Sequence, residues 1–288
     1  VQAVFIRHLE KSGWPISGRL SNADVFDKLV APKLLESGRR VAYLLIDAMR
    51  YELGVELAKH LNEAGQVEVQ VACAQMPTVT QVGMATLLPG AGQSFKLLNK
   101  ENQVVPTLGD QQLTSVAQRM DVLQKRYGQR FAEMDLVRFV RDNLKIESTV
   151  ELLVIRSNDM DNDFEANPEA APGLISRTFQ KIRSAIYKLR DLGFQDVIIV
   201  TDHGFFLNTA IEPGDICTKP SGKWINVHER TLLGDGIGDA SNLVLPSEMY
   251  GIKGDFNQVA VPRALVAYRA GQWYFHGGIS LQEAIVPV

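Results

Sequence analysis

The chain has 288 residues, a net charge of −3 and a pI of about 6.0. Its 45% hydrophobic and 22% charged residues allow a sizeable core and exclude a disordered protein. This balance also excludes the broad basic surface of a protein that coats nucleic acid, although metal ions could supply positive charge to a local site.

Cysteine use and hydropathy indicate the compartment. Cys73 and Cys217 are too few for a disulfide framework, so we expect a reducing, cytoplasmic setting. No apolar run approaches the roughly 20 residues that span a bilayer, and no signal-peptide pattern opens the chain. The chain begins at Val1 without Met, which suggests a piece of a longer protein.

Apolar periodicity predicts the first elements. Residues 1–40 form a helical segment, and the continuous apolar run Val41–Ile46 is typical of a strand buried on both faces of a parallel sheet. A helix over residues 50–64, a strand over 67–74 and a helix over 82–88 follow.

The middle of the chain has a different pattern. Residues 94–150 predict an inserted cap with helices over 111–127 and 131–144, between strands of the main sheet. Further on, the sequence predicts strands over 151–155 and 197–200, with one long amphipathic helix over 172–192 between them. A Gly- and Pro-rich loop over 205–238 follows, and late strands are expected at 260–268 and 273–275.

Strands that alternate with helices indicate an α/β protein with a doubly wound sheet and helices on both faces. We expect an N-terminal segment, 1–40, and a main domain, 41–288, that carries the inserted helical cap at 94–150. Functional sites of such sheets lie at the carboxyl ends of the strands.

Acidic residues follow three of these predicted strands. Asp47 follows the first, Asp202-His203 follows the strand at 197–200, and Asp159, Asp161 and Asp163 follow the strand at 151–155. Carboxylates gathered at one edge repel one another unless cations balance them, so the pattern favours a metal cluster.

Each motif also has a simpler interpretation. Asp47 alone would be a helix N-cap, Asp-His-Gly a turn, and the acidic run a solvated loop or a calcium-binding loop, although the run lacks the Gly and terminal Glu of an EF-hand. Their shared position at strand ends favours the metal cluster.

Two further residues join the hypothesis. Thr80 stands where a helix begins, so backbone N–H groups could hold a phosphate there and a metal ion could activate the hydroxyl; the alternative is that Thr80 or Thr78 caps the helix. His276 precedes a Gly-Gly turn that allows close backbone approach, which favours a ligand role. His8, His60 and His228 lack such context and are expected on the surface.

This order of motifs resembles the alkaline-phosphatase superfamily. Within it, the segments Leu-Ile-Asp47-Ala-Met-Arg-Tyr-Glu-Leu, Met-Pro-Thr-Val-Thr80-Gln-Val-Gly-Met and His276-Gly-Gly-Ile-Ser-Leu-Gln-Glu resemble PglZ domains, components of bacterial BREX phage-defence systems. The resemblance runs from about residue 41 to residue 288.

The resemblance implies two divalent metal ions, most simply zinc, with Thr80 as nucleophile. One ion would be bound by Asp47, Asp202 and His203. The other would be bound by Asp159, Asp163 and His276, with Asp161 as a competitor for either carboxylate role. Many superfamily members have His at the position of Asp163, so Mn²⁺ or Mg²⁺ is an alternative at this oxygen-rich site.

The implied activity is hydrolysis of a phosphodiester, either a nucleic acid or a nucleotide, in phage defence with other BREX proteins. A diester is favoured over a monoester because Arg50, Lys219, Lys223 and Arg230, the cations near the motifs, belong to no recognisable phosphate-binding motif. The alternative is a weak or inactive metal-binding scaffold within a BREX complex.

Overall fold

A computed structural model describes residues 1–62, 65–142, 145–208, 216–271 and 273–288. At its centre is a parallel sheet of four strands in the order β7-β8-β2-β9. These strands are β2 (Val41–Ile46), β7 (Phe131–Asp135), β8 (Leu152–Ser157) and β9 (Asp196–Thr201).

Strand β2 is wholly buried because it lies between two hydrophobic cores. Val41, Tyr43 and Leu45 face one core, whereas Ala42 and its alternate neighbours face the other. This is the expected consequence of side chains alternating along a strand that is covered on both faces.

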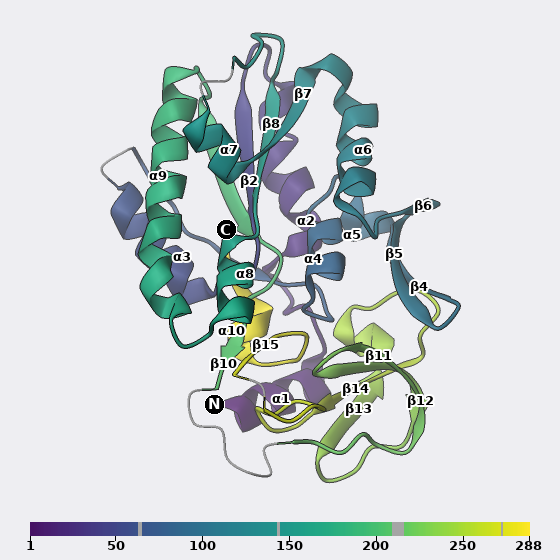
Figure 1. Cartoon of the computed structure of the whole chain (residues 1–288). Coiled ribbons are helices and arrows are strands. Elements are labelled where there is room, and N and C mark those ends of the chain that lie inside the picture. Colours follow the sequence, from purple (N-terminus) through teal and green to yellow (C-terminus); the bar gives the residue numbers. More distant parts are fainter. Residues whose placement is uncertain (63–64, 143–144, 209–215, 272) are drawn as a thin grey trace.

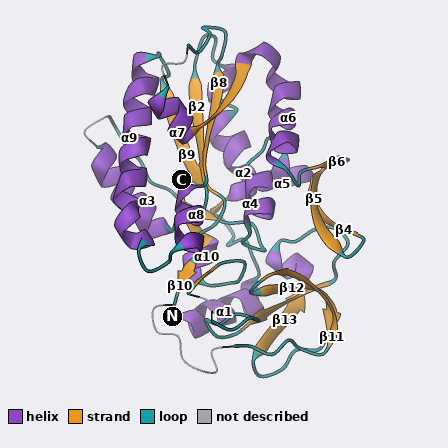
Figure 2. Ribbon diagram, viewed as in Figure 1, coloured by secondary structure: helices purple, strands orange, loops and turns teal. Residues whose placement is uncertain are grey.

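Helices cover both faces of the sheet (Figures 1 and 2). One face packs against α3 (Tyr51–Leu61), α7 (Leu136–Arg141) and α9 (Ile175–Asp191). The other packs against α2 (Asn22–Val25), α4 (Thr80–Thr86) and α6 (Val116–Tyr127). The predicted doubly wound α/β architecture is confirmed.

Smaller sheets flank this layer. They comprise β1 (Leu20–Ser21), β3 (Val71–Cys73) and β16 (Ile285–Pro287); β4 (Phe95–Lys100), β5 (Gln103–Leu108) and β6 (Gln111–Gln112); β10 (Phe206–Leu207) and β15 (Tyr274–Phe275); and β11 (Gly222–His228), β12 (Thr231–Gly236), β13 (Asn242–Pro246) and β14 (Gln258–Pro262). The other α-helices are α1 (Gln2–Ser12), α5 (Ala91–Ser94), α8 (Asp159–Ala166) and α10 (Leu281–Ala284). Short π and 3₁₀ turns occupy Phe26–Val30, Lys33–Leu35, Gly128–Arg130, Ala171–Leu174 and Ser247–Tyr250.

Three expectations about local structure are wrong. The acidic run at 159–163 is not a loop but the start of helix α8. Residues 205–238, also expected to be a loop, include strands β11 and β12, which pair with each other. The helix expected over 131–144 begins instead with strand β7, whose pairing with β8 overrides the local helical pattern.

The segments predicted as an N-terminal unit and a cap both contribute to the main body. Phe5, Ile6 and Leu9 of α1 belong to the same hydrophobic cluster as alternate residues of β2. Strand β7, from the region 94–150, is an edge strand of the central sheet. Residues 143 and 144, at the end of the expected second cap helix, lie outside the described residues.

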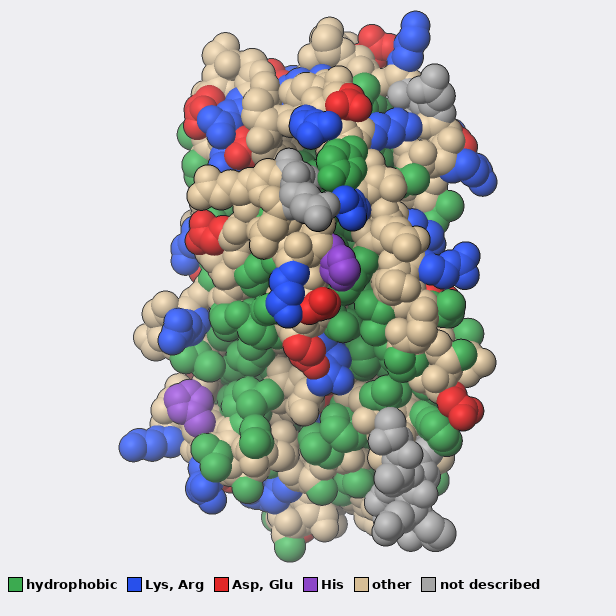
Figure 3. Space-filling model, turned by 90° about the vertical axis from the view of Figure 1, so that its left-hand side faces the viewer, with side chains coloured by type: hydrophobic (Ala, Val, Ile, Leu, Met, Phe, Trp, Pro, Cys, Tyr) green, Lys and Arg blue, Asp and Glu red, His purple; other side chains and the backbone are tan. Residues whose placement is uncertain are grey.

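The distribution of charged side chains on the surface agrees with the small net charge of the chain. On the face shown in Figure 3, Lys and Arg side chains are dispersed among acidic and apolar ones rather than gathered into one basic patch. Among the residues that the structure describes, no helix is both long and apolar enough to cross a membrane.

Candidate active site

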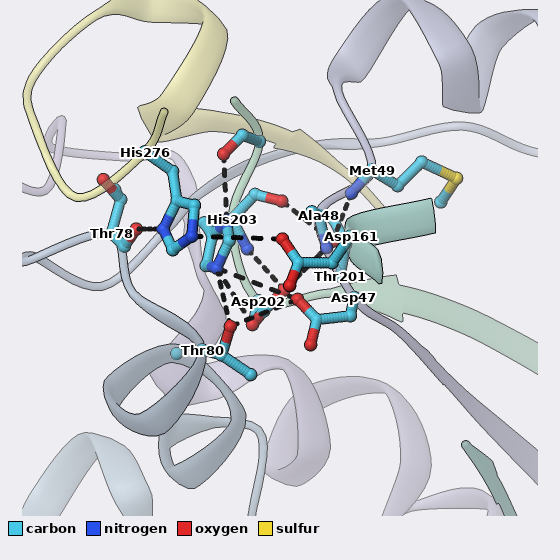
Figure 4. Close-up of polar contacts among 12 residues, drawn as sticks. Asp47, Ala48, Met49, Thr78, Thr80, Asp161, Thr201, Asp202, His203 and His276 are labelled. Atoms are coloured by element: carbon cyan, nitrogen blue, oxygen red, sulfur yellow. Dashed lines mark hydrogen bonds and ion pairs between the residues drawn. The ribbon is translucent and has the colours of Figure 1, made fainter. Parts of the chain in front are cut away.

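The carboxyl ends of two central strands carry the first group of site residues. Asp47 directly follows β2, and Asp202 and His203 directly follow β9, its neighbour in the sheet. Their ligand atoms lie within 4.8 Å of one another, and all three side chains are buried. Figure 4 shows these side chains converging with Thr80 and His276.

The hydrogen bonds of His203 determine which ring nitrogen faces this group. Nδ1 lies 2.9 Å from the carbonyl oxygen of Gly204, which can only accept, so Nδ1 carries the proton. Nε2 therefore presents its lone pair toward Asp202 Oδ2 at 3.3 Å and Asp47 Oδ1 at 3.8 Å. A backbone carbonyl that holds the far nitrogen in this way is typical of metal-ligating histidines.

The carboxylates of this group have no directly paired Lys or Arg among the described residues. Within the same part of the chain, Asp202 Oδ2 is buried without a hydrogen-bond partner. Burial, followed by the charges of Asp202 and Asp161, raises the pKa of Asp47 well above its usual range. A buried, unpartnered oxygen beside a second carboxylate and a histidine lone pair matches the donor set of a divalent cation.

Thr80 does not cap the helix that it begins. The N-cap of α4 is Val79, without a side-chain capping bond, and the Thr78 hydroxyl donates instead to the carbonyl oxygen of Gly278 at 2.8 Å. Thr80 Oγ1 lies 3.3 Å from Asp47 Oδ1 and 3.2 Å from His203 Nε2. Capping is therefore excluded for both threonines, and the Thr80 hydroxyl points into the acidic group.

Close packing of α4 holds Thr80 in this position. A Cβ atom at Gly83, one turn after Thr80, would lie 2.6 Å from Cβ of Asp202. Only glycine lets the helix approach β9 so closely.

A second group consists of Asp161, Glu165 and His276, whose ligand atoms also lie within 4.8 Å of one another. His276 Nδ1 donates to the carbonyl oxygen of Thr78 at 3.0 Å, so its Nε2 faces Asp161 Oδ1 at 3.9 Å. Tyr274 donates its hydroxyl hydrogen to the same Asp161 oxygen. Burial raises the pKa of Asp161 and of Glu165 and lowers that of His276 well below its usual value.

This group differs from the predicted set of Asp159, Asp163 and His276. On a helix, residues four apart share a face, so Asp159 and Asp163 lie on one side of α8, and Asp161 and Glu165 on another. The carboxylate of Asp159 pairs with Lys181 instead. Two acidic residues four positions apart do belong to the group, but they are Asp161 and Glu165. The helical pattern of α8 is the signal that could have identified Glu165.

His228 is not the isolated surface residue that the sequence suggests. Its ring stacks on His276 with centroids 4.3 Å apart, and His276 stacks on His203 at 4.2 Å. His228 Nδ1 lies 3.3 Å from the carbonyl oxygen of His276, and burial lowers the pKa of His228. Because β11 belongs to a different sheet, no local sequence signal places it there.

A buried ion pair supports the turn after His276. Arg230 and Glu283 are wholly buried and paired, so Arg230 is not a substrate-binding cation. Glu283 also accepts hydrogen bonds from the backbone N–H of Gly278 at 2.8 Å and of Ser280 at 2.9 Å. Gly277 has φ +97°, a conformation that favours glycine.

We expect Arg230→Met to lower the free energy of unfolding by about 3–5 kcal/mol, because Glu283 would remain buried without its cation. Urea denaturation measures the loss. Lys223→Met, an exposed position on β11, is the control and should change stability by no more than about 0.5 kcal/mol. Equal effects of the two substitutions would show that the pair does not hold the turn.

Two cavities adjoin the site. The larger, about 760 Å³, is lined by Thr80 and by residues of the β4–β5 hairpin and of β11. The smaller, about 370 Å³, is lined by aromatic residues, among them Phe164 and Trp273, together with charged and polar ones. Glu165, His228 and His276 line both, so the second group lies where the cavities meet.

Two known proteins are similar to this chain in sequence. The Alkaline phosphatase-like protein PglZ of Bacillus cereus (strain H3081.97) is 27% identical over 96% of this chain and 33% of its own length. The Alkaline phosphatase-like protein BrxZ of Escherichia coli O9:H4 (strain HS) is 26% identical over the same shares. The chain thus spans about a third of these relatives.

Solved structures support the fold. Murine ectonucleotide pyrophosphatase / phosphodiesterase 5 aligns with a TM-score of 0.56 and 11% identity, over 86% of this chain and 87% of that one. An inactive variant of the murine protein, with a threonine replaced by alanine and in complex with AMP, aligns with a TM-score of 0.55 and 10% identity, over 86% and 87% of the two chains.

Residues 25–288 match the family described as the BREX system PglZ alkaline phosphatase-like domain. This match covers far more than half of the chain. The chain therefore belongs to the PglZ family.

Proposed function

We propose that this domain is a metal-dependent phosphodiesterase with Thr80 as its nucleophile. The observation that carries the proposal is the position of Thr80 Oγ1, which points into the group formed by Asp47, Asp202 and His203 instead of capping its helix. In the murine phosphodiesterase, a threonine-to-alanine variant is inactive, which supports a threonine-dependent reaction in a protein of this fold.

The residues fit two divalent ions. Asp47, Asp202 and His203 would hold one, and their mixed nitrogen and oxygen donors suit zinc. Asp161, Glu165 and His276 would hold the other, in place of the predicted set with Asp159 and Asp163. This second set also offers two carboxylates and one imidazole, so zinc suits it too, and Mn²⁺ or Mg²⁺ is the alternative at such oxygen-rich donors. Bound ions would balance the buried carboxylates, favour the alkoxide of Thr80 and stabilise charge on the phosphoryl oxygens.

Residues of the chain hold the Thr80 hydroxyl in position for attack on the phosphorus atom. The Thr80 hydroxyl, held between Asp47 and His203, attacks phosphorus; the Oγ1–P bond forms as the bond to the first alcohol breaks, and that alcohol leaves with a proton. Water then breaks the Oγ1–P bond and restores the hydroxyl. The tight packing of Gly83 against Asp202 keeps Oγ1 in place through both steps.

The four cations named from the sequence give a doubly charged phosphate no support, and the Lys and Arg residues that do line the cavities are Lys100 and Arg269. Arg230 is paired with buried Glu283, and Arg50 is paired with Glu52 and lies over the ring of Phe205. Neither lines either cavity, nor do Lys219 and Lys223. A singly charged diester needs less cationic support than a doubly charged monoester.

The family description and the relatives support a proposal for the biological setting. The family is described as a BREX component, so we infer that this domain acts with other BREX proteins in bacterial phage defence, on nucleic acid or nucleotides. Because the chain spans about a third of those relatives, their remaining segments would contribute further contacts.

Two measurements test the proposal. The purified domain should contain divalent metal by elemental analysis. With Zn²⁺ or Mn²⁺ it should hydrolyse bis(4-nitrophenyl) phosphate faster than 4-nitrophenyl phosphate, and EDTA should remove the activity. No bound metal and no turnover with any added ion would reject the hydrolase.

The second candidate is a metal-binding scaffold without turnover. The acidic helix α8 favours it, because Asp163, where the resemblance implies that many superfamily members have histidine, is a carboxylate, and so is Glu165 of the second group. The same assay separates the two: a scaffold binds metal but hydrolyses neither ester. In that case Glu165→His is expected to create activity.

A further inference from the structure

The smaller cavity has aromatic walls. Phe164, Tyr274 and Phe275 are buried beside it, and Phe164 stacks on Tyr274 with centroids 5.5 Å apart and planes inclined by 19°. Their mutual packing fixes these rings. Trp273 is different, because 38% of it is exposed and its indole is available to a ligand.

Polar groups at the rim complement these rings. Arg269 and Glu229 both line the cavity, and neither side chain forms a hydrogen bond or an ion pair with another described residue. The Arg269 guanidinium can only donate hydrogen bonds, and the ionised Glu229 carboxylate can only accept them. Aromatic faces with a few convergent polar groups suit a flat heterocycle that carries donors and acceptors on its edge.

The position of the cavity relates it to the reacting phosphate. It meets the larger cavity at Glu165, His228 and His276, whereas Thr80 lines only the larger one. A phosphate beside Thr80 would therefore lie in the larger cavity, next to the residues at which the smaller cavity begins. A diester carries two substituents, so each can enter its own cavity.

We propose that the smaller cavity is a subsite for one nucleobase of the diester, with Trp273 as its stacking partner and Arg269 and Glu229 facing its polar edge. The inference rests on the proposed function in taking the substrate to be a nucleic-acid diester. Base stacking on an aromatic side chain tolerates any sequence, so the subsite distinguishes nucleotides from simple esters rather than one base from another.

The test is a binding measurement that needs no turnover. The Thr80→Ala protein, loaded with Zn²⁺, is titrated by calorimetry with adenylyl-adenosine and with two analogues, each lacking one of the two bases. One analogue should bind about 5- to 150-fold more weakly through loss of the stacked base. In Thr80→Ala/Trp273→Ala this difference should disappear, and Trp273→Phe should retain most of it.

Gln81→Ala is the matched control, because Gln81 lines only the larger cavity. In the Thr80→Ala protein, this substitution should leave unchanged the difference in affinity between adenylyl-adenosine and the weaker-binding analogue. Equal binding of all three probes, persistence of the difference without Trp273, or its loss in Gln81→Ala would each overturn the subsite.

Wild-type hydrolysis of bis(4-nitrophenyl) phosphate separates the two proposals. Turnover of that ester without base-dependent binding rejects the subsite alone. Base-dependent binding through Trp273 without turnover of any diester retains the subsite and rejects the hydrolase.

Discussion

Replacing Thr80 with alanine is expected to lower kcat for a diester by about 10⁴-fold or more, because the covalent route loses its nucleophile. Metal content and the temperature of unfolding should change little, since the Thr80 hydroxyl caps no helix and its hydrogen bonds within the described part of the chain are those to Asp47 and His203. Steady-state kinetics on bis(4-nitrophenyl) phosphate, together with elemental analysis of the same preparation, measures both expectations.

Thr80→Ser is the control. It keeps a hydroxyl and removes one methyl group, a change worth about 10- to 200-fold in a well-packed site, so it should remain far more active than the alanine variant. A burst of alcohol release in the serine variant, absent with alanine, would identify the covalent step. Full activity of Thr80→Ala would mean that water, not Thr80, attacks phosphorus.

Much of the main sheet follows from local patterns. Strand β2 is a continuous apolar run because it is covered on both faces. Strand β9 also contains an apolar run, Val197–Val200, although most of it is only partly buried, so the edge that receives Asp47, Asp202 and His203 is predictable. Strand β7 is not predictable, because it is a half-exposed edge strand whose identity depends on pairing with β8.

The second acidic group could not be predicted from local sequence patterns. Acidic residues at alternate positions from Asp159 to Glu165 do not reveal which face of the segment turns inward until it is known to be a helix. His228 and His276 are 48 residues apart and meet only because β11 lies beside the turn after β15. Such contacts depend on how separate sheets pack, which no motif spacing records.

Asp47→Asn is expected to abolish metal binding at the first group and yet stabilise the metal-free protein. The folded-state pKa of Asp47 is raised by burial and by Asp202 and Asp161, whereas in the unfolded chain it is about 3.9. The folded protein therefore retains a proton that the unfolded chain has released. Stability falls as the pH rises from about 4 to the raised pKa, by up to about 1.4 kcal/mol per pH unit.

The asparagine side chain of this variant has no such proton, so the variant should gain stability over wild type steadily across this window. Urea denaturation in EDTA between pH 5 and pH 8 measures the difference. The raised pKa values of Asp161 and Glu165 act in the same direction, and the lowered pKa of His276 acts in the opposite one below about pH 6.5. These groups are present in both proteins, so the difference between the two pH profiles reports Asp47 together with its interaction with Asp202 and Asp161.

Excess Zn²⁺ should reverse the order of stability. Metal that binds only the folded state adds about 2.7 kcal/mol at a hundredfold excess over its Kd, and only wild type retains the full first group. Parallel pH profiles in EDTA, or equal stabilisation of both proteins by zinc, would contradict a metal site at Asp47. The expected crossover means that the buried acidic cluster destabilises the empty fold and is retained because a cation compensates it, as a catalytic centre requires and a structural core does not.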